Sequence, residues 1–292
     1  MCIARAKLRQ FLKPRSTTLQ RAPSCRMEPH KSYAAPLRGP GIQPDWHMQH
    51  TSGQVCLAIT IRRICQIPAM TVALFDFDGT FVRTTVWQRL VHYQLSHRIN
   101  VLPTLIHCAA HFPLYPLVRV GLLDTLTFRR VWAAHVPWLL FGMKVSDAQR
   151  MFAAVVNQDL VPAIREELIE RLRWHQDQGH TPILVSGALT PLTRAFADEI
   201  GITHVVGSLL EVRNGRYTGR SLSPPCFGEG KVTHLLQYLQ KHGLVVDWDH
   251  SYSYADSFSD EPILSIVGNP VAVAPDESLR QLALQAGWQI IC

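Results

Sequence analysis

The sequence lacks the cysteine patterns that stabilise small secreted or zinc-bound folds. Its seven cysteines among 292 residues are an odd number, are scattered along the chain, and include no C-x-x-C motif. We therefore expect neither a disulfide framework nor a zinc ribbon, and a reducing cytoplasm is the expected compartment.

Acidic residues are scarce in the first 69 residues, where eleven Lys or Arg accompany only Glu28 and Asp45. This segment also has no sustained hydrophobic period, so we expect residues 1–69 to be disordered, and translation from Met70 is the simplest interpretation. A basic arm for phosphate or anionic lipid and a targeting peptide are the alternatives. The remaining chain carries 18 basic and 20 acidic residues, which does not favour nucleic acid as a partner.

Several well-known catalytic and binding motifs are missing. No G-x-S-x-G surrounds Ser186, which excludes the nucleophile elbow of a serine hydrolase. The stretch GEGK at 228–231 is not a Walker loop, because position 225 is proline and Lys231 is followed by valine. His107 and His111 have the spacing of zinc ligands on a helix, but no glutamate accompanies them, so core or capping histidines are favoured.

From Met70 onward, short apolar runs alternate with amphipathic segments, as they do in βα units. Because such units place helices on both faces of a parallel sheet, we expect a Rossmann-like three-layer α/β sandwich with a mainly parallel sheet. Strands are expected at 71–75, 181–186, 203–208, 252–256 and 270–274, and helices at 162–178, 190–200, 231–242 and 277–286.

Two segments interrupt this alternation. Asn214-Gly215 lies between two alternating runs and predicts a β-hairpin. Residues 82–160 contain helical patterns only, so we expect an inserted all-helical domain, with a core formed by 70–81 and 161–292. Within it, residues 99–118 contain no charged side chain and are long enough to span a bilayer. Three prolines and two histidines in this window favour buried helices, or helices that graze a membrane, over a true span.

Two aspartates end the first predicted strand, in the stretch ALFDFDGT at 73–80. Because side chains alternate along a strand, Asp76 and Asp78 leave the same face. Two carboxylates so close cannot both be ionised in an apolar site unless a cation joins them or one takes a proton. The carboxyl end of a parallel strand is also where open sheets bind ligands. The pair therefore indicates a site, in which Thr80 could offer a hydroxyl and an amide to an anion.

Three further segments carry polar groups suited to phosphate and a hard cation. Asp256 and Asp260 follow another predicted strand and could supply oxygen ligands to Mg²⁺, although solvated loop acids are an alternative. Ser186 and Gly187 end a strand and could bind a phosphoryl oxygen, although an ordinary turn has the same pattern. Lys231 opens a helix and could reach a phosphate or remain solvated.

In order along the chain, these segments read D-x-D-G-T, S-G, K and D-S-x-x-D. From Met70 to Cys292 this set resembles the haloacid dehalogenase superfamily, most closely subclass IB, which includes phosphoserine phosphatase-like enzymes. The resemblance implies that Asp76 attacks phosphorus to form an aspartyl-phosphate, while Asp78 acts as general acid and then as general base. It also implies that the predicted helical insertion is a cap over the active site, and it assigns residues to phosphoryl and metal binding. Phosphoryl binding would fall to Ser186 and Lys231, beside the groups of Thr80 and Gly187 noted above. Mg²⁺ would be held by Asp76, the backbone carbonyl of Asp78 and Asp256, with Asp260 as a direct or water-mediated partner.

The resemblance implies a Mg²⁺-dependent phosphomonoesterase acting on a small phosphorylated metabolite. Phosphoserine phosphatases carry a glutamate soon after the first motif, but this chain has no acid between Asp78 and Asp124. The aromatic-rich cap, with its uncharged window at 99–118, is instead somewhat similar to that of bacterial phosphatidylglycerophosphate phosphatases. A membrane-associated lipid-phosphate phosphatase is therefore the alternative, with peripheral membrane contact through the cap. A phosphotransferase and a binding protein without turnover also remain open, as does the oligomeric state.

Overall fold

The computed structural model of the protein describes residues 69–122 and 124–292, so the expectations for residues 1–68 lie outside the described residues. A six-stranded sheet forms the centre of the fold, and every neighbouring pair of its strands is parallel. In spatial order the strands are β3 (His204–Ser208), β2 (Thr181–Leu189), β1 (Val72–Phe75), β6 (Tyr252–Ala255), β7 (Asn269–Val273) and β8 (Gln289–Ile291).

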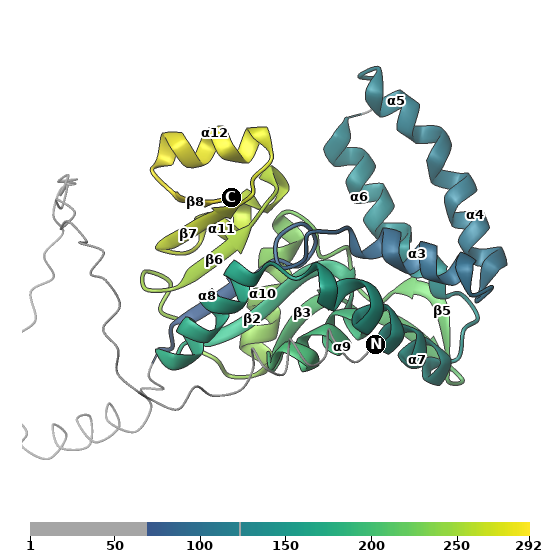
Figure 1. Ribbon diagram of the computed structural model, residues 1–292, viewed down its shortest axis with the longest axis horizontal. Coiled ribbons are helices and arrows are strands. Elements are labelled where there is room, and N and C mark those ends of the chain that lie inside the picture. The colour runs from purple at the N-terminus through teal and green to yellow at the C-terminus, as the bar shows by residue number, and fades with distance from the viewer. Residues whose placement is uncertain (1–68, 123) are drawn as a thin grey trace, which may run out of the picture. The chain divides into compact units, whose positions relative to one another are not determined.

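Helices cover both faces of this sheet (Figure 1). The alternation of β1 sends Val72 and Leu74 into a core with α10 (Glu229–Lys241) and α11 (Glu261–Ser265). It sends Ala73 and Phe75 into a second core with α8 (Glu166–Asp177) and α9 (Thr190–Ile200). A third cluster joins α12 (Glu277–Ala286) to β7. The predicted three-layer α/β fold with a mainly parallel sheet is confirmed.

An inserted helical cap lies between β1 and β2. Its helices are α3 (Val86–Ser96), α4 (Val101–His111), α5 (Tyr115–Arg119), α6 (Thr125–His135) and α7 (Val145–Val155), with shorter helical turns between them. The helices α4, α5 and α6 project away from the sheet (Figure 1). Helix α4 rests against α6, where the His111 and His135 rings meet at 3.0 Å.

Ten of the twenty residues in the apolar window at 99–118 are exposed and three are buried, so the expectation of buried helices is wrong for most of the window, while the alternative of helices that graze a membrane stays a prediction. Among the described residues, one helix, Val101–Arg119, is long and apolar enough to cross a membrane by length and composition, yet only 17% of its apolar window is buried. The physical reason is that α4 rests on the rest of the cap along one face, where Thr104, His107 and His111 are buried.

The predicted hairpin is formed by β4 (Leu210–Arg213) and β5 (Arg216–Ser221), which pair antiparallel. Its two turn residues both have positive φ, 49° at Asn214 and 71° at Gly215, as a type I′ turn requires. The hairpin lies against residues 142–145 at the base of the cap. There Gly142 N donates to the Tyr217 carbonyl and Tyr217 N donates to the Met143 carbonyl, each at 2.9 Å.

Candidate active site

The carboxyl end of β1 carries the two aspartates predicted from the first motif. The Asp76 amide still donates to the Tyr254 carbonyl of β6 at 2.9 Å, so this residue is anchored to the sheet. Beyond it the chain turns at Gly79, whose φ of +76° is accessible to glycine at little cost. Asp76 and Asp78 both line one cavity, as the motif predicted.

A second pair of carboxylates reaches the same place from the loop after β6. Oxygen atoms of Asp76, Asp256 and Asp260 lie within 4.8 Å of one another. The Thr80 hydroxyl contacts Asp76 Oδ2 at 2.9 Å and Asp256 Oδ1 at 2.8 Å. Since this hydroxyl is engaged by the two carboxylates, it helps to assemble the acidic cluster, and its predicted role toward phosphate stays a prediction.

Lys231 supplies the positive charge of the cluster. It lies in the first turn of α10 and is only 3% exposed, and its Nζ lies 2.5 Å from Asp76 Oδ1 and 2.7 Å from Asp260 Oδ1. Burial alone would lower the pKa of Lys231, but the neighbouring Asp260 and Asp76 carboxylates raise it above its ordinary value. This lysine therefore stays charged throughout the physiological pH range.

Among the described residues, Lys231 is the one cation in direct contact with this cluster, whose three carboxylates outnumber it. Burial and the neighbouring Asp76 carboxylate raise the pKa of Asp256, and burial raises that of Asp260 despite the adjacent Lys231. A cluster that holds protons in this way is short of positive charge, and a divalent cation with a preference for carboxylate oxygens would supply it. The residues present therefore fit Mg²⁺.

Asp78 occupies a different environment from Asp76. Its Oδ1 accepts a hydrogen bond from the amide of Val86 at the start of α3, at 2.5 Å. Burial is the main reason that the pKa of Asp78 rises to about 7, against the opposing effect of this hydrogen bond. A carboxyl group with this pKa can both give and take a proton near neutral pH.

The S-G motif at the end of β2 is only partly exposed to the cavity. Gly187 lines it, together with the following residue, Ala188. Ser186 is fully buried, and its hydroxyl accepts a hydrogen bond from the Ala188 amide at 3.0 Å. The structure therefore places Gly187 at the cavity wall, while the Ser186 side chain bonds to the strand backbone beside it, where the register of β2 with β3 shifts.

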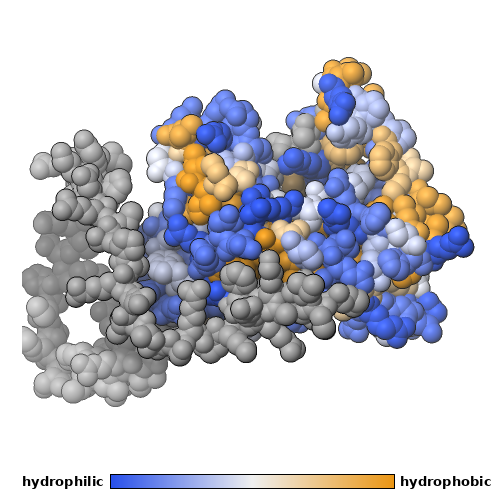
Figure 2. All heavy atoms as spheres, viewed as in Figure 1, coloured by the Kyte–Doolittle hydropathy of each residue, from blue (hydrophilic) through white to orange (hydrophobic). Residues whose placement is uncertain are grey.

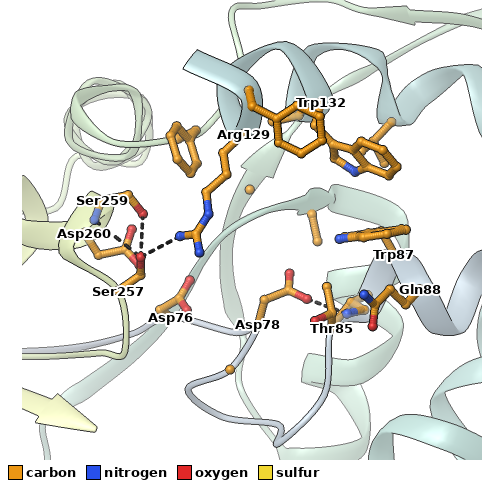
Figure 3. A pocket seen from close by; sticks show the side chains of 18 of the residues that line it. Asp76, Asp78, Thr85, Trp87, Gln88, Arg129, Trp132, Ser257, Ser259 and Asp260 are labelled. Carbon is orange, nitrogen blue, oxygen red and sulfur yellow. Dashed lines mark hydrogen bonds between the residues drawn. The ribbon is translucent and has the colours of Figure 1, made fainter. Parts of the chain in front are cut away.

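Cap and core together enclose a cavity of about 560 Å³ (Figure 3). Opposite the acidic cluster, the rings of Trp87 of α3 and Trp132 of α6 are in contact, with 4.3 Å between centroids and 52° between their planes. Arg129 of α6 reaches across the cavity, where its Nη1 donates to the Ser257 hydroxyl at 2.9 Å. None of these residues was predicted from the sequence, because no local motif marks them and their position depends on how the cap packs.

Arg165 is a further residue that sequence reasoning missed. Its guanidinium donates to the Gly79 carbonyl at 3.1 Å through Nη2 and at 3.3 Å through Nε. It therefore fixes the turn that follows the two aspartates from outside the cavity. Its place just before α8 carries no motif that would have revealed this contact.

Comparison with known proteins agrees with this geometry. The family model of the haloacid dehalogenase-like hydrolases matches residues 73–265, about two thirds of the chain. A histidinol-phosphatase of Neisseria meningitidis is 29% identical over 227 residues, which are 75% of this chain and 97% of that protein. A phosphoserine phosphatase of Mycobacterium tuberculosis is 29% identical over 230 residues, 77% of this chain and 71% of that protein.

A solved structure of a protein of unknown function from Bordetella pertussis superimposes with a TM-score of 0.66 at 26% identity, over 77% of this chain and 99% of that one. Together with the matched family model and the two phosphatases, this similarity confirms the resemblance found in the motifs. The chain is a phosphatase and belongs to the haloacid dehalogenase-like hydrolase family.

Proposed function

We propose that the protein is a Mg²⁺-dependent phosphomonoesterase that acts through an aspartyl-phosphate on a small phosphorylated metabolite. The observation that carries this proposal is the convergence of Asp76, Asp256, Asp260 and Lys231 on one cavity wall. Phosphoryl transfer requires mainly positioning and neutralisation of charge, and these side chains provide both.

Asp76 is the nucleophile in this proposal. Its two carboxylate oxygens are held in place, Oδ1 by Lys231 and Oδ2 by the Thr80 hydroxyl. One carboxylate oxygen forms a bond to phosphorus while the bond between phosphorus and the ester oxygen breaks. Lys231 compensates the charge around Asp76 and the phosphoryl oxygens throughout.

Asp78 handles the proton. In the first step the protonated carboxyl group gives its proton to the leaving oxygen, so that an alcohol departs. In the second step a water molecule attacks phosphorus and loses a proton to Asp78, and inorganic phosphate leaves as the Asp76 carboxylate is regenerated. The pKa of about 7 suits both directions of transfer.

Mg²⁺ would be held by Asp76, the backbone carbonyl of Asp78, Asp256 and Asp260. When bound, the ion neutralises negative charge on the transferring phosphoryl group. Burial first, and then the nearby Asp76 carboxylate, raise the pKa of Asp256, and a bound cation would offset both effects, which supports this assignment.

Hydrolysis of a generic aryl phosphate tests the proposal. We expect turnover that depends on Mg²⁺ and that falls below detection in Asp76→Asn, because the uncatalysed reaction is extremely slow. The matched control is Asp177→Asn, at an exposed aspartate on the end of α8, which should retain parental activity. Retention of turnover in a folded Asp76→Asn variant would refute the aspartyl-phosphate route.

A second candidate, a lipid-phosphate phosphatase, is favoured by the lining of the cavity. Tyr115 and Val118 of α5, Phe128 and Trp132 of α6 and Trp87 of α3 give it a largely apolar cap side. A comparison of kcat/KM for histidinol phosphate, phosphoserine and phosphatidylglycerophosphate in mixed micelles separates the two candidates. A preference for the lipid of more than tenfold would favour the second.

A further inference from the structure

The outer face of the cap exposes large apolar side chains to solvent. We define the apolar ridge as the exposed apolar residues of α4, α5 and the turns beside them. Leu102 is 68% exposed, Phe112 64% and Leu122 78%. Figure 2 shows apolar side chains gathered along this edge of the cap. The members of the apolar ridge are Leu102, Leu105, Ile106, Phe112, Leu117, Val120 and Leu122.

The orientation of α4 is fixed by contacts on its opposite face. The buried Thr104 hydroxyl donates to Gln94 Oε1 of α3 at 3.0 Å, and buried His111 contacts His135 of α6. Because this polar face is paired with the rest of the cap, α4 cannot rotate to bury its apolar residues without breaking these contacts. The exposure of the apolar ridge is therefore fixed by the packing of the cap, and an exposed apolar patch of this kind marks an interaction surface.

Charge on this part of the chain identifies the partner. No Asp or Glu occurs between Gly79 and Leu123, whereas four arginines do: Arg83, Arg89, Arg98 and Arg119. Arg98 and Arg119 flank the α4 to α5 segment and are both exposed. An apolar face bordered by arginines matches a surface with an apolar interior and negatively charged headgroups.

A second copy of the chain is a poorer match. In a two-fold symmetric contact the same patch meets itself, so arginines would face arginines with no acidic residue on the segment to pair with them. A transmembrane span also fits poorly. The segment Val101–Arg119 has the length and composition of a span, but its Thr104, His107 and His111 side chains are buried against the rest of the cap, so lipid could not surround it on all sides.

We propose that the apolar ridge docks the cap on the surface of an anionic bilayer. The ridge adjoins the catalytic cavity, because Tyr115, Val118 and Arg119 of α5 line that cavity while Leu117 and Val120 lie exposed on or beside the same helix. Docking therefore brings one wall of the catalytic cavity to the headgroup region. The inference is independent of the catalytic roles assigned above, and a folded Asp76→Asn variant should dock as well as the parent.

Co-sedimentation of the full chain with vesicles tests the proposal. The vesicles contain phosphatidylglycerol and phosphatidylcholine, or phosphatidylcholine alone, and binding is measured at low salt and near 1 M salt. High salt screens the attraction of the basic residues 1–69, since the Debye length falls to about 3 Å, but leaves apolar insertion intact. We expect binding to anionic vesicles that persists in part at high salt.

Variants then locate the contact. Leu105→Glu with Ile106→Glu should lower the partition coefficient at least tenfold, as should the separate pair Val120→Glu with Leu122→Glu at the other end of the ridge. Leu284→Glu is the matched control, because this residue of α12 is 65% exposed but lies outside the ridge. Equal binding of a folded ridge variant and the parent would overturn the proposal. So would a parent that binds no vesicle and elutes as a dimer that the ridge variants dissociate.

Discussion

Arg129 of the cap and Ser257 of the core meet across the catalytic cavity, with 2.9 Å between the guanidinium Nη1 and the hydroxyl. Ser257 directly follows Asp256, so this contact joins helix α6 to the loop that carries the second pair of carboxylates. The cap thus presents a positive charge to the place where a phosphorylated substrate would sit.

Arg129→Ala should raise KM about tenfold or more while changing kcat less, because the guanidinium contributes to binding but is not among the groups that react. Arg130→Ala is the control, since Arg130 is its exposed neighbour and does not line the cavity. Steady-state kinetics with the best substrate measures both parameters. An unchanged KM in Arg129→Ala would show that this residue does not contact the substrate.

Lys231→Met should destabilise the protein strongly in the absence of Mg²⁺. Removing one member of a buried ion pair leaves charge uncompensated and costs about 3–5 kcal/mol of unfolding free energy. Arg83→Met breaks the exposed pair with Glu167, and should cost at most about 1 kcal/mol. Denaturant unfolding of both variants compares a buried and an exposed pair in one protein, and equal costs would contradict the burial argument.

Gly79→Ala should reduce activity at least tenfold and also lower stability. The new Cβ would overlap the Asp256 carboxylate, at a position where φ is already +76°. Gly142→Ala is a closely matched control, because Gly142 has the same φ of +76° but no atom within 4 Å of its Cβ position. The difference between the two variants measures the steric conflict apart from the backbone strain, and similar activities would argue against a crowded site.

Acid should destabilise the fold through His175. This histidine is fully buried between His180 and the Tyr254 hydroxyl, and burial lowers its pKa to about 3. The unfolded chain binds the proton near pH 6.5, so stability is fully present above that value and is lost as the pH falls from about 6.5 toward 3. At pH 5, one such histidine lowers the free energy of unfolding by roughly 2 kcal/mol.

The measurement is the free energy of unfolding as a function of pH for the parent and for His175→Gln. For the variant, the slope of unfolding free energy against pH between pH 6.5 and pH 4 should be shallower. The difference should correspond to about one proton fewer taken up on unfolding, even if the variant is less stable at pH 7. Parallel curves would mean that another group binds the proton.

Mg²⁺ should raise the melting temperature, because it binds only where the three carboxylates are assembled. At a concentration one hundred times Kd the gain is about 2.7 kcal/mol, and chelation with EDTA should reverse it. Asp256→Asn should lose most of this gain, while sodium chloride at equal ionic strength should not produce it. A parent that melts at the same temperature with and without Mg²⁺ would contradict the metal assignment.

The positions of the site residues along the chain could be predicted because they end strands or begin a helix. A parallel sheet brings the carboxyl ends of its strands to one edge, so Asp76, Gly187 and Asp256 had to lie near one another once the strands were recognised. Their order in the sequence then indicated the family.

The cap side of the site could not be predicted in the same way. Trp87 and Arg129 reach the cavity only because α3 and α6 pack over the core at a particular angle, and neither residue belongs to a local motif. The strand β8 was also missed, since its three residues, Gln289–Ile291, are too few to show a period. The sequence left open whether the 99–118 window is buried or grazes a membrane, because an apolar composition does not reveal what lies against it.

The hairpin β4–β5 constrains how substrate can enter. Its backbone hydrogen bonds to residues 142–145 attach the base of the cap to a hairpin that follows directly after β3. An outward rotation of the entire cap would break several of these hydrogen bonds, each worth about 0.5–1.5 kcal/mol. Bending of α5 and α6 alone would leave those bonds intact while releasing the Arg129 contact. Of these two motions, bending of α5 and α6 breaks fewer hydrogen bonds, so we expect substrate to enter past the outer end of the cap while its base stays in place.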